Sequence, residues 1–292
     1  PWHLNPAVWR KHLLDDILPH WLDHAIDADH GGYVTQFDRH WRPIGDGAKT
    51  LVSQTRVLFN FTVGYRHTHD DAFRHAAEHG LDFLLARFAD NRLGGWFWAT
   101  ARDGAVADDA KLAYGHAFAI LALAEFARAF DDPNAKRLAI NTFDTLNEKL
   151  ADPDHGGYWT RADRFWRPTD PRHSQNPHMH LLEALLSLAA VADQPDILAA
   201  ARALANLACD KFIHPVHGCL EEYFNPDWSP LPDRNAGSIE IGHQFEWAWL
   251  LNRLADATGE NACRPVADTL LNWGVRFGVD PVEREIGRAS CR

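Results

Sequence analysis

Hydrophobic residues along this chain recur mainly at helical spacing. Two segments, residues 117–124 and 181–189, are almost wholly apolar, which predicts helices that are buried on several sides. Three others, residues 71–88, 133–150 and 195–212, carry apolar positions every three or four residues, which is typical of half-exposed amphipathic helices. A buried helix therefore alternates with an amphipathic one along the chain.

Short glycine-containing segments separate these helices at regular intervals. Their first glycines are 62 or 63 residues apart, and four copies occur, at residues 29–33, 92–96, 154–158 and 216–220. A second motif, Asp-Arg-x-Trp-Arg-Pro, occupies residues 38–43 and 163–168, with a looser version at residues 225–230. Each repeat is therefore a pair of helices, and we expect the glycine segment to form a short extended excursion or hairpin.

Helix pairs of this length either stack into an open superhelix or close into a ring. The helix after each glycine segment is the more apolar one, and its polar residues gather near its start. This distribution favours an inner ring of helices whose N-terminal ends line a pit. The sequence therefore predicts an all-α fold, a barrel of helix pairs. An open scaffold for binding proteins is the alternative.

The repeat breaks near the C-terminus. The residues at 280–283 parallel those at 152–155, so a Gly-Gly pair is expected next, but Arg284 and Glu285 stand there. We therefore predict one domain over residues 1–283, about four and a half helix pairs, and a non-native tail at residues 284–292. On this interpretation the chain is truncated at its C-terminal end, and a genuine short polar tail is the alternative.

Composition and charge narrow the choice of partner. The 292 residues are 46% hydrophobic, and their formal net charge of −11 argues against nucleic acid and membranes as partners. Neither a signal peptide nor a run of about 18 apolar residues is visible. The four cysteines form no Cys-x-x-Cys pair, which suits a cytoplasmic protein. The 12 tryptophans and 18 histidines favour a small-molecule, sugar-sized pocket.

The candidate chemistry centres on residues 242–251, which read Gly-His-Gln-Phe-Glu-Trp-Ala-Trp-Leu-Leu. His243 and Glu246 are three residues apart, so they lie on one face of a helix. A histidine oriented by a carboxylate is a usual general base near neutral pH. The helix dipole disfavours imidazolium in the first turn, so we expect a neutral ring. A buried histidine bonded to a glutamate for packing is the alternative.

Polar residues stand at similar distances, 20 to 25 residues, after the first glycine of each repeat. If the inner helices begin on one rim, five of these side chains converge on one pit: Arg56, Tyr114, Asn176, His180 and His243. His180 also has a carboxylate three residues later, at Glu183. His178 and His180 could be a metal pair, but residues two apart on a helix face different ways. We therefore expect no metal.

Residues 176–184 (Asn-Pro-His-Met-His-Leu-Leu-Glu-Ala) and 242–247 carry a resemblance to a known family. Up to about Val282 the chain resembles the N-acylglucosamine 2-epimerase superfamily, most closely its mannose isomerase and sulfoquinovose isomerase branch. The resemblance implies an (α/α)6 barrel, and six repeats of this length exceed the chain. It therefore agrees with the truncation that the broken repeat suggests.

The resemblance also implies an enzyme that needs no cofactor or metal. It would convert an aldose such as D-mannose into its ketose through an enediolate. His243 would be the general acid/base at C1 and C2, and Glu246 would orient it. His180 would assist ring opening or polarise the substrate oxygen. A second catalytic histidine is implied in the final helix pair, for which this chain has no position. The residues implied to bind substrate are Arg56, Tyr114, Asn176 and Arg234.

Other functions stay open at this point. A sugar 2-epimerase, of the N-acylglucosamine or cellobiose type, is the alternative in the same class of enzyme. A glycoside hydrolase would need two carboxylates flanking the bond, and the candidates are Asp108 with Asp109, or Glu240 with Glu246. A non-catalytic sugar or protein binder would use the aromatic pit. The sequence predicts neither the preferred aldose nor the number of subunits.

Overall fold

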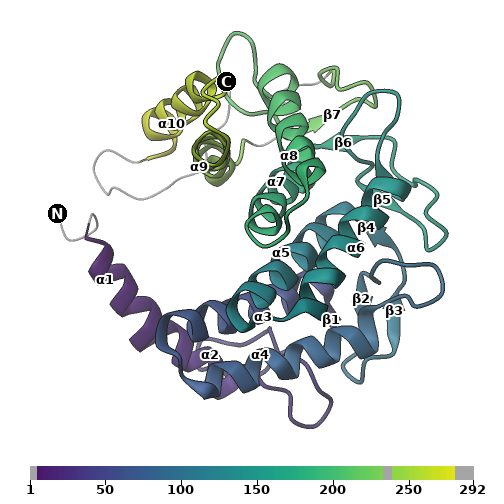
Figure 1. The fold of residues 1–292 in the computed structure, drawn as a ribbon, viewed down its shortest axis with the longest axis vertical. Coiled ribbons are helices and arrows are strands. Elements are labelled where there is room, and N and C mark those ends of the chain that lie inside the picture. The colour runs from purple at the N-terminus through teal and green to yellow at the C-terminus, as the bar shows by residue number, and fades with distance from the viewer. Residues whose placement is uncertain (1–4, 233–238, 280–292) are drawn as a thin grey trace. The chain divides into compact units, whose positions relative to one another are not determined.

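The structure of the chain is a computed structural model that describes residues 5–232 and 239–279 (Figure 1). Most of these residues are in helices, and the strands are two or three residues long. None of the described helices combines the length and the apolar character that crossing a membrane requires. In chain order the elements are α1 (Pro6–Lys11), η2 (His12–Ile17), α2 (Leu18–Ala25), β1 (Lys49–Thr50), α3 (Leu51–Thr68), α4 (Asp71–Phe83), η3 (Leu84–Phe88), β2 (Ala99–Thr100), β3 (Val106–Asp108), β4 (Lys111–Leu112), α5 (Ala113–Phe130), α6 (Pro133–Leu150), β5 (Arg161–Ala162), β6 (His173–Ser174), α7 (Gln175–Ala189), α8 (Pro195–Leu207), η4 (Ala208–Phe212), β7 (Tyr223–Phe224), α9 (Ile241–Thr258) and α10 (Arg264–Gly278).

The helices predicted from hydrophobic spacing are confirmed. Residues 71–88 form α4 and η3, residues 133–150 form α6, and residues 195–212 form α8 and η4. The two apolar segments lie within α5 and α7. α4 begins where the Asp70 side chain accepts the N–H of Ala72. In the first and third of these segments the final turn is a π-helix.

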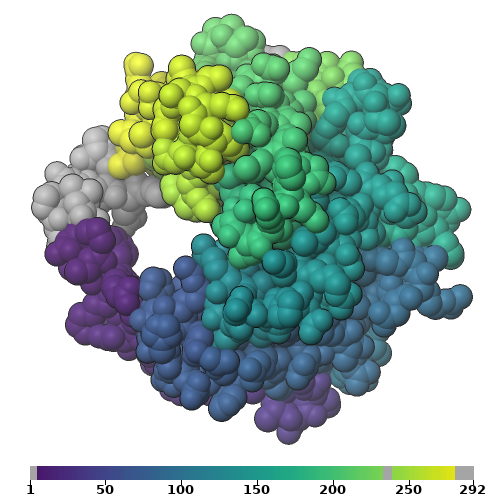
Figure 2. Space-filling view, viewed as in Figure 1, coloured from purple at the N-terminus to yellow at the C-terminus, as the bar shows by residue number. Residues whose placement is uncertain are grey.

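The chain folds into two compact units. Among the described residues, the first unit holds residues 5–111 and 118–145, and the second holds residues 112–117, 146–232 and 239–279. In the first unit α3 packs against α4, and β1, β2 and β3 form an antiparallel sheet in that order. In the second unit α7 packs against α8 and α9, and β6 pairs antiparallel with β7. The surfaces of α9 and α10 lie against each other (Figure 2).

The predicted single domain over residues 1–283 stays a prediction. The break in the repeat at Arg284 and Glu285 and the tail at residues 284–292 lie outside the described residues.

Each glycine segment forms the hairpin that the sequence predicts. Gly156 and Gly157, in the third copy, have φ angles of +76° and +74°, a backbone region that residues other than glycine rarely adopt. Gly157 has a second constraint, because a Cβ atom there would lie 2.7 Å from His178 Nε2. An isolated antiparallel bridge closes each loop, and the four bridges join Ile26 to Tyr33, Ala89 to Trp96, Ala151 to Tyr158 and Ile213 to Leu220.

The Trp-Arg-Pro motif forms a second hairpin in three of the repeats. Trp41, Trp166 and Trp228 have φ angles of 60°, 66° and 62°. Each donates its backbone N–H to the carbonyl three residues earlier. The looser copy at residues 225–230 therefore folds like the other two. The bridges that close these hairpins join Phe37 to Pro43, Ala162 to Pro168 and Phe224 to Pro230.

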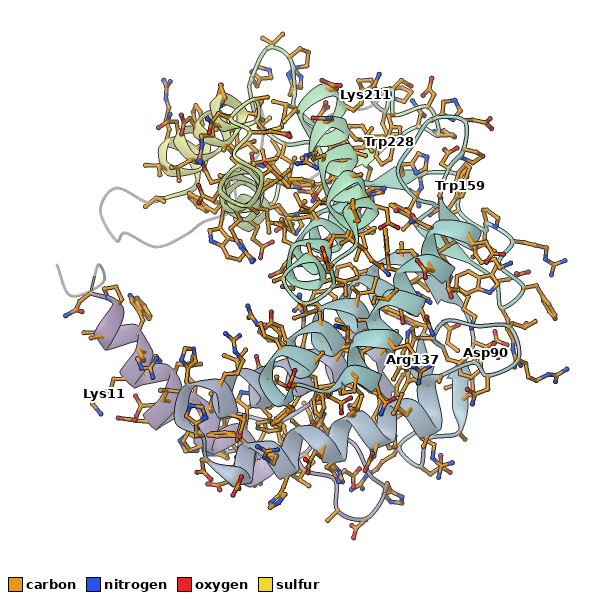
Figure 3. All side chains as sticks on the ribbon, viewed as in Figure 1. Lys11, Asp90, Arg137, Trp159, Lys211 and Trp228 are labelled. Carbon is orange, nitrogen blue, oxygen red and sulfur yellow. The ribbon has the colours of Figure 1, made fainter. Side chains whose placement is uncertain are left out.

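A buried ion pair ties the strand before each of two inner helices to the preceding glycine loop. Lys49 Nζ lies 3.0 Å from Asp27 Oδ2, and Lys111 Nζ lies 3.1 Å from Asp90 Oδ2 (Asp90 is labelled in Figure 3). Burial by itself raises the pKa of Asp27, but hydrogen bonds from Arg102 and Lys49 outweigh it and lower the pKa to about 2. The Asp27 carboxylate is therefore an ionised partner inside the fold.

In the third repeat His173 stands where the earlier repeats have lysine. Its Nε2 lies 3.2 Å from Asp152 Oδ2, and neither side chain is exposed. The imidazole stacks on Trp159 and Trp228, with ring centroids 4.9 Å and 4.2 Å away (Figure 3). Burial lowers the pKa of His173 in spite of the aspartate. An imidazole stacked on two tryptophans therefore stands where the earlier repeats have a lysine.

Two neighbouring glycines give a direct test of the third loop. Gly156→Ala is expected to destabilise the protein by about 1–2 kcal/mol, because alanine is strained at positive φ while no atom lies within 4 Å of its Cβ. Gly157→Ala should cost clearly more, since its methyl group also collides with His178. Urea denaturation of both variants measures the difference. Equal losses would contradict a close contact between the loop and α7.

Candidate active site

One hydrogen bond fixes the register of three inner helices against their glycine loops. The backbone N–H of Tyr33 is donated to Gln54 Oε1 at 2.8 Å, and that of Leu220 to Gln244 Oε1 at 2.9 Å. In the third repeat the N–H of Tyr158 is donated to His178 Nε2 at 2.8 Å. The three acceptors therefore occupy equivalent positions in α3, α7 and α9.

These acceptors define which site candidates are equivalent. His180 and Glu246 each follow their acceptor by two residues, as Arg56 does in α3. His243 instead precedes its acceptor by one residue. Counting from the glycines made His243 the equivalent of Arg56 and His180. The structure shows that Glu246 is their equivalent, three residues or almost one helical turn further along α9. The count fails there because the connection from loop to helix is longer: Gln244 follows Gly218 by 26 residues, whereas Gln54 follows Gly31 by 23.

His178 is a structural histidine. Its Nδ1 lies 2.8 Å from the carbonyl oxygen of Ser174, and its Nε2 accepts the N–H of Tyr158. Both ring nitrogens therefore have protein partners. The ring is fully buried, and burial lowers its pKa to about 3. His178 therefore has no lone pair to offer a metal or a substrate.

His243, in the first turn of α9, faces a different environment. Its Nδ1 lies 3.0 Å from both carboxylate oxygens of Glu222, which precedes β7. The Glu222 side chain is 7% exposed and that of His243 is 20% exposed. The carboxylate that orients His243 is therefore Glu222 and not Glu246, the partner expected from the sequence. An extended segment brings Glu222 to Nδ1, a contact that spacing along α9 does not reveal.

The electrostatics of His243 also differ from the expectation of a disfavoured imidazolium. Burial by itself lowers the pKa of His243. The hydrogen bond and charge of Glu222 oppose it, and Glu246 and Glu240 add to that effect. The net result is a pKa above the ordinary value of 6.5. Three carboxylates therefore outweigh the effect of burial.

His180 lies on α7 in a second, similar pair. Its Nδ1 is 3.2 Å from Glu183 Oε2, as the three-residue spacing predicts. Its ring stands edge-on to Tyr114 of α5, with centroids 5.3 Å apart and planes at 81°. Only 9% of the His180 side chain is exposed. The structure thus brings together Tyr114, His180 and Glu183, all in the second unit.

Glu246 shares a small pocket with His180. The pocket lies between α7 and α9, and its space of about 200 Å³ includes open solvent. Glu246 therefore stands beside the His180–Glu183 pair while still acting electrostatically on His243. The lining residues are Met179, His180, Glu183, Glu246, Trp249 and Leu250.

The remaining candidates fall into three situations. Asn176, at the start of α7, has a buried Oδ1 for which the described residues provide no hydrogen-bond donor. Arg56, on α3 in the first unit, places its guanidinium 4.3 Å from the centroid of the Phe118 ring. Arg234 lies outside the described residues. The roles given to these three side chains stay predictions.

Sequence reasoning missed Glu222 and its neighbour Gln175. Gln175 is the first residue of α7, and its backbone N–H is donated to the carbonyl oxygen of Glu222 at 3.1 Å. Its side-chain Nε2 lies 2.8 Å from Glu222 Oε2. The signal in the sequence was an acidic pair, Glu221-Glu222, directly after the fourth glycine segment. Nothing local connects that pair to α9.

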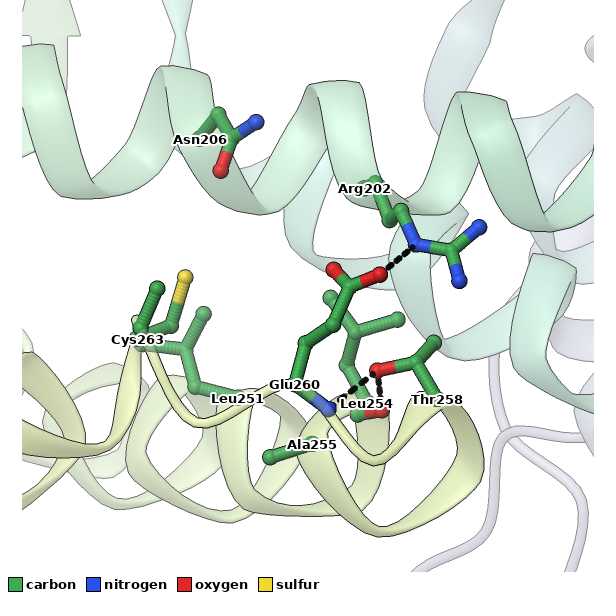
Figure 4. Close-up of a pocket in the computed structure, with 9 residues that line it drawn as sticks. Arg202, Asn206, Leu251, Leu254, Ala255, Thr258, Glu260 and Cys263 are labelled. Carbon is green, nitrogen blue, oxygen red and sulfur yellow. Dashed lines mark hydrogen bonds and ion pairs between the residues drawn. The ribbon is translucent and has the colours of Figure 1, made fainter.

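A second hollow of about 290 Å³ lies between α8 and the turn that joins α9 to α10 (Figure 4). Arg202 Nε and Glu260 Oε1 form an ion pair of 3.0 Å at its edge. Its lining includes Leu251, Leu254 and Cys263 but none of the predicted site residues. No group of three potential metal-ligating side chains occurs in residues 5–232 and 239–279.

Comparisons with known proteins agree on the family. A sequence profile of the N-acylglucosamine 2-epimerase (GlcNAc 2-epimerase) family matches residues 9–287. A mannose-6-phosphate isomerase from Rhizobium meliloti is 34% identical over 96% of this chain and 71% of its own length. A cellobiose 2-epimerase from Bacteroides fragilis is 26% identical over 96% of this chain and 70% of its own length.

Among solved structures, a D-mannose isomerase matches with a TM-score of 0.90 and 27% identity, over 98% of this chain and 74% of that one. The predicted fold class, an all-α barrel of helix pairs, is confirmed by this match. Fold and relatives together define an enzyme that isomerises or epimerises carbohydrates. The chain belongs to the N-acylglucosamine 2-epimerase family.

The position of Glu222 predicts how the pKa of His243 responds to mutation. Glu222→Gln removes the negative charge beside Nδ1, so the pKa of His243 should fall below its wild-type value. Glu246→Gln should lower it less, because Glu246 makes a smaller contribution. Titration of the His243 ring by NMR measures both. A larger fall for Glu246→Gln would restore Glu246 as the orienting residue.

Proposed function

We propose that this chain is a metal-independent aldose–ketose isomerase that acts on a free monosaccharide, of the D-mannose to D-fructose type. The observation that carries the proposal is the contact of Glu222 with His243. A carboxylate at Nδ1 favours the tautomer in which Nδ1 bears the proton and Nε2 has a free lone pair. Together with a raised pKa, this makes Nε2 a competent general base.

The reaction follows from that base. In the opened aldose, His243 Nε2 takes the proton from C2, and the C–H electron pair forms the C1=C2 double bond. The C1 carbonyl pair moves onto O1, giving an enediolate. The hydroxyl proton on O2 then passes to O1, and the O2 electrons form the C2 carbonyl. The C1=C2 electron pair takes the proton from His243 Nε2 to C1, which gives the ketose and restores the neutral base. Proton transfer on one face needs a single base, and His243 can return the proton that it took.

The other predicted site residues would hold the sugar and its developing charge. Asn176 Oδ1, buried without a protein donor, suits a substrate hydroxyl. His180, paired with Glu183, and Glu246 beside it would exchange protons during ring opening. Tyr114 lies against His180 and would contact the sugar from the same side. Arg56 and Arg234 would stabilise negative charge on oxygen.

The charge of the site favours a free sugar over a phosphorylated one. The groups that act on His243 are Glu222, Glu246 and Glu240, and the partner of His180 is Glu183. A phosphate dianion near these carboxylates would be repelled. The chain as a whole carries a formal net charge of −11, which acts in the same direction. We therefore propose D-mannose, rather than its 6-phosphate, as the type of substrate.

A 2-epimerase is the second candidate, and the cellobiose 2-epimerase among the relatives favours it. Both reactions begin with removal of the C2 proton. They differ in where the proton returns: to C1 for the ketose, or to C2 from the opposite face for the epimer. Epimerisation therefore needs either a second acid on the other face or rotation of the intermediate.

We propose the cytoplasm as the compartment, supported by the free thiols of Cys209, Cys219 and Cys263.

The proposal predicts turnover of D-mannose to D-fructose that survives treatment with a chelator. His243→Ala should reduce this turnover by about 10²–10⁴-fold, the usual contribution of a general base. His217→Ala, which changes an exposed histidine of the same unit, is the matched control and should retain wild-type activity. The measurements are fructose formation over time and circular dichroism of each variant. Loss of turnover on chelation, or faster reaction of mannose 6-phosphate, would contradict the proposal.

Reaction in D2O distinguishes the two candidate outcomes. An isomerase that works through an enediolate should place deuterium at C1 of the ketose, because the proton on His243 exchanges with solvent. An epimerase should instead produce glucose with deuterium at C2 and no ketose. NMR of the products reads both positions. Ketose that carries no deuterium at all would indicate direct transfer of hydrogen from C2 to C1 and would count against the enediolate.

A further inference from the structure

Three side chains form a hydrogen-bonded chain behind His243. Trp247 Nε1 donates to Gln175 Oε1 at 2.6 Å, and Gln175 Nε2 donates to Glu222 Oε2 at 2.8 Å. Glu222 in turn lies 3.0 Å from His243 Nδ1. Trp247 and Gln175 are both completely buried. His243 and Trp247 are four residues apart on α9, so one helix face provides both ends of the chain.

The indole determines which way the Gln175 amide points. An indole N–H can only donate, so the amide must turn its oxygen toward Trp247. The amide nitrogen then faces Glu222 and also lies 2.9 Å from His243 Nδ1. With Nδ1 protonated, the amide and the imidazole are both donors, and both donate to the Glu222 carboxylate rather than to each other. A reversed amide would place its oxygen 2.8 Å from a carboxylate oxygen, where two acceptors repel each other. Trp247 therefore prevents the reversal.

The oriented amide in turn holds the Glu222 carboxylate in place. A buried carboxylate without a fixed donor would turn toward water and leave Nδ1 for part of the time. Gln175 provides a donor that carries no charge, so the full negative charge of Glu222 still acts on the imidazole. A lysine or arginine in its place would neutralise that charge. The remaining charged groups that act on His243 are Glu246, on its own helix, and Glu240, at the start of that helix.

We propose that Gln175 and Trp247 are positioning residues for His243, which act through Glu222 to hold the imidazole in the tautomer with a free Nε2. The inference rests on the proposed function for its catalytic consequence. Its structural content, the tautomer of His243 in the resting protein, does not depend on any reaction. The two can therefore be tested separately.

Two variants interrupt the hydrogen-bonded chain from Trp247 to Glu222 at different residues. Gln175→Met keeps the length of the side chain and removes both of its polar atoms. Trp247→Phe keeps an aromatic ring and removes only the N–H donor and part of the ring. Trp96→Phe is the matched control, because Trp96 is 4% exposed and its Nε1 donates a hydrogen bond of 3.1 Å to Thr142 Oγ1 in the first unit. All three lose a buried hydrogen bond, but only two lose one behind His243.

The first readout is the tautomer of His243, measured by ¹⁵N NMR at a pH where the ring is neutral. The wild-type protein should show protonated Nδ1 and unprotonated Nε2. Gln175→Met and Trp247→Phe should show a mixture in which the Nε2-protonated form appears, and the pKa of the ring should fall. Trp96→Phe should leave both properties at their wild-type values.

The second readout is isomerase activity as a function of pH. Each of the two network variants should lose about tenfold in kcat, roughly the effect of one buried hydrogen bond, with little change in KM. The acidic limb of kcat/KM should move to lower pH in both. The double variant should lose little more than either single variant, because both substitutions interrupt the same hydrogen-bonded chain.

Two results would overturn the inference. One is an unchanged His243 tautomer in both network variants, even if they lose activity, since that loss would then reflect packing. The other is an equal effect of Trp96→Phe on the pH profile. If Trp247→Phe does not fold, Gln175→Met decides the question by itself. A wild-type protein with the expected tautomer but no turnover of mannose would refute the proposed function and leave the positioning network intact.

Discussion

The site depends on one type of hydrogen bond, found in three of the repeats, between a backbone N–H of the glycine loop and a side chain in the first turn of the next helix. Tyr33, Tyr158 and Leu220 donate these bonds to Gln54, His178 and Gln244. The bond requires only an acceptor at that position, so glutamine and histidine are interchangeable there. Because it fixes how each helix is rotated, the residues beside the acceptor are free to vary from repeat to repeat. Function is built on those neighbouring positions.

The two histidines His178 and His243 show how far environment, rather than residue type, sets the chemistry. His178 occupies the acceptor position, has partners at both nitrogens, and is held neutral by burial, with a pKa of about 3. His243 stands one residue before the acceptor of its own helix, where only Nδ1 meets the Glu222 carboxylate, and its pKa is raised. The shift of one position separates a structural ring from a reactive one.

The sequence predicted the helices well because their boundaries follow from local patterns of polarity. Residues 71–88, 133–150 and 195–212 are recovered in full, and only the final π-turns of two segments went unpredicted. Polarity does not record a shift of one residue in the hydrogen-bond ladder. Within the site, His180 with Glu183 was predictable because both lie on one helix face. Glu222 was not, since its approach to His243 depends on the pairing of β6 with β7, which places Glu222 opposite Gln175. The buried pairs Lys49–Asp27 and Lys111–Asp90 were also missed, because the partners lie more than 20 residues apart in the sequence and meet only in the folded chain.

Two opposing effects set the pKa of His243. The balance between them explains why Gln175, the residue behind Glu222, is neutral. Burial disfavours the imidazolium, and the carboxylate of Glu222 favours it. Burial by itself would give an available but weak base, and charge by itself would give a strong base that is already protonated. General bases work best with a pKa near the operating pH, so neither effect serves without the other. An amide behind Glu222 fixes the geometry of the carboxylate and leaves its charge intact. A cation at that place would have removed the charge on which the balance depends.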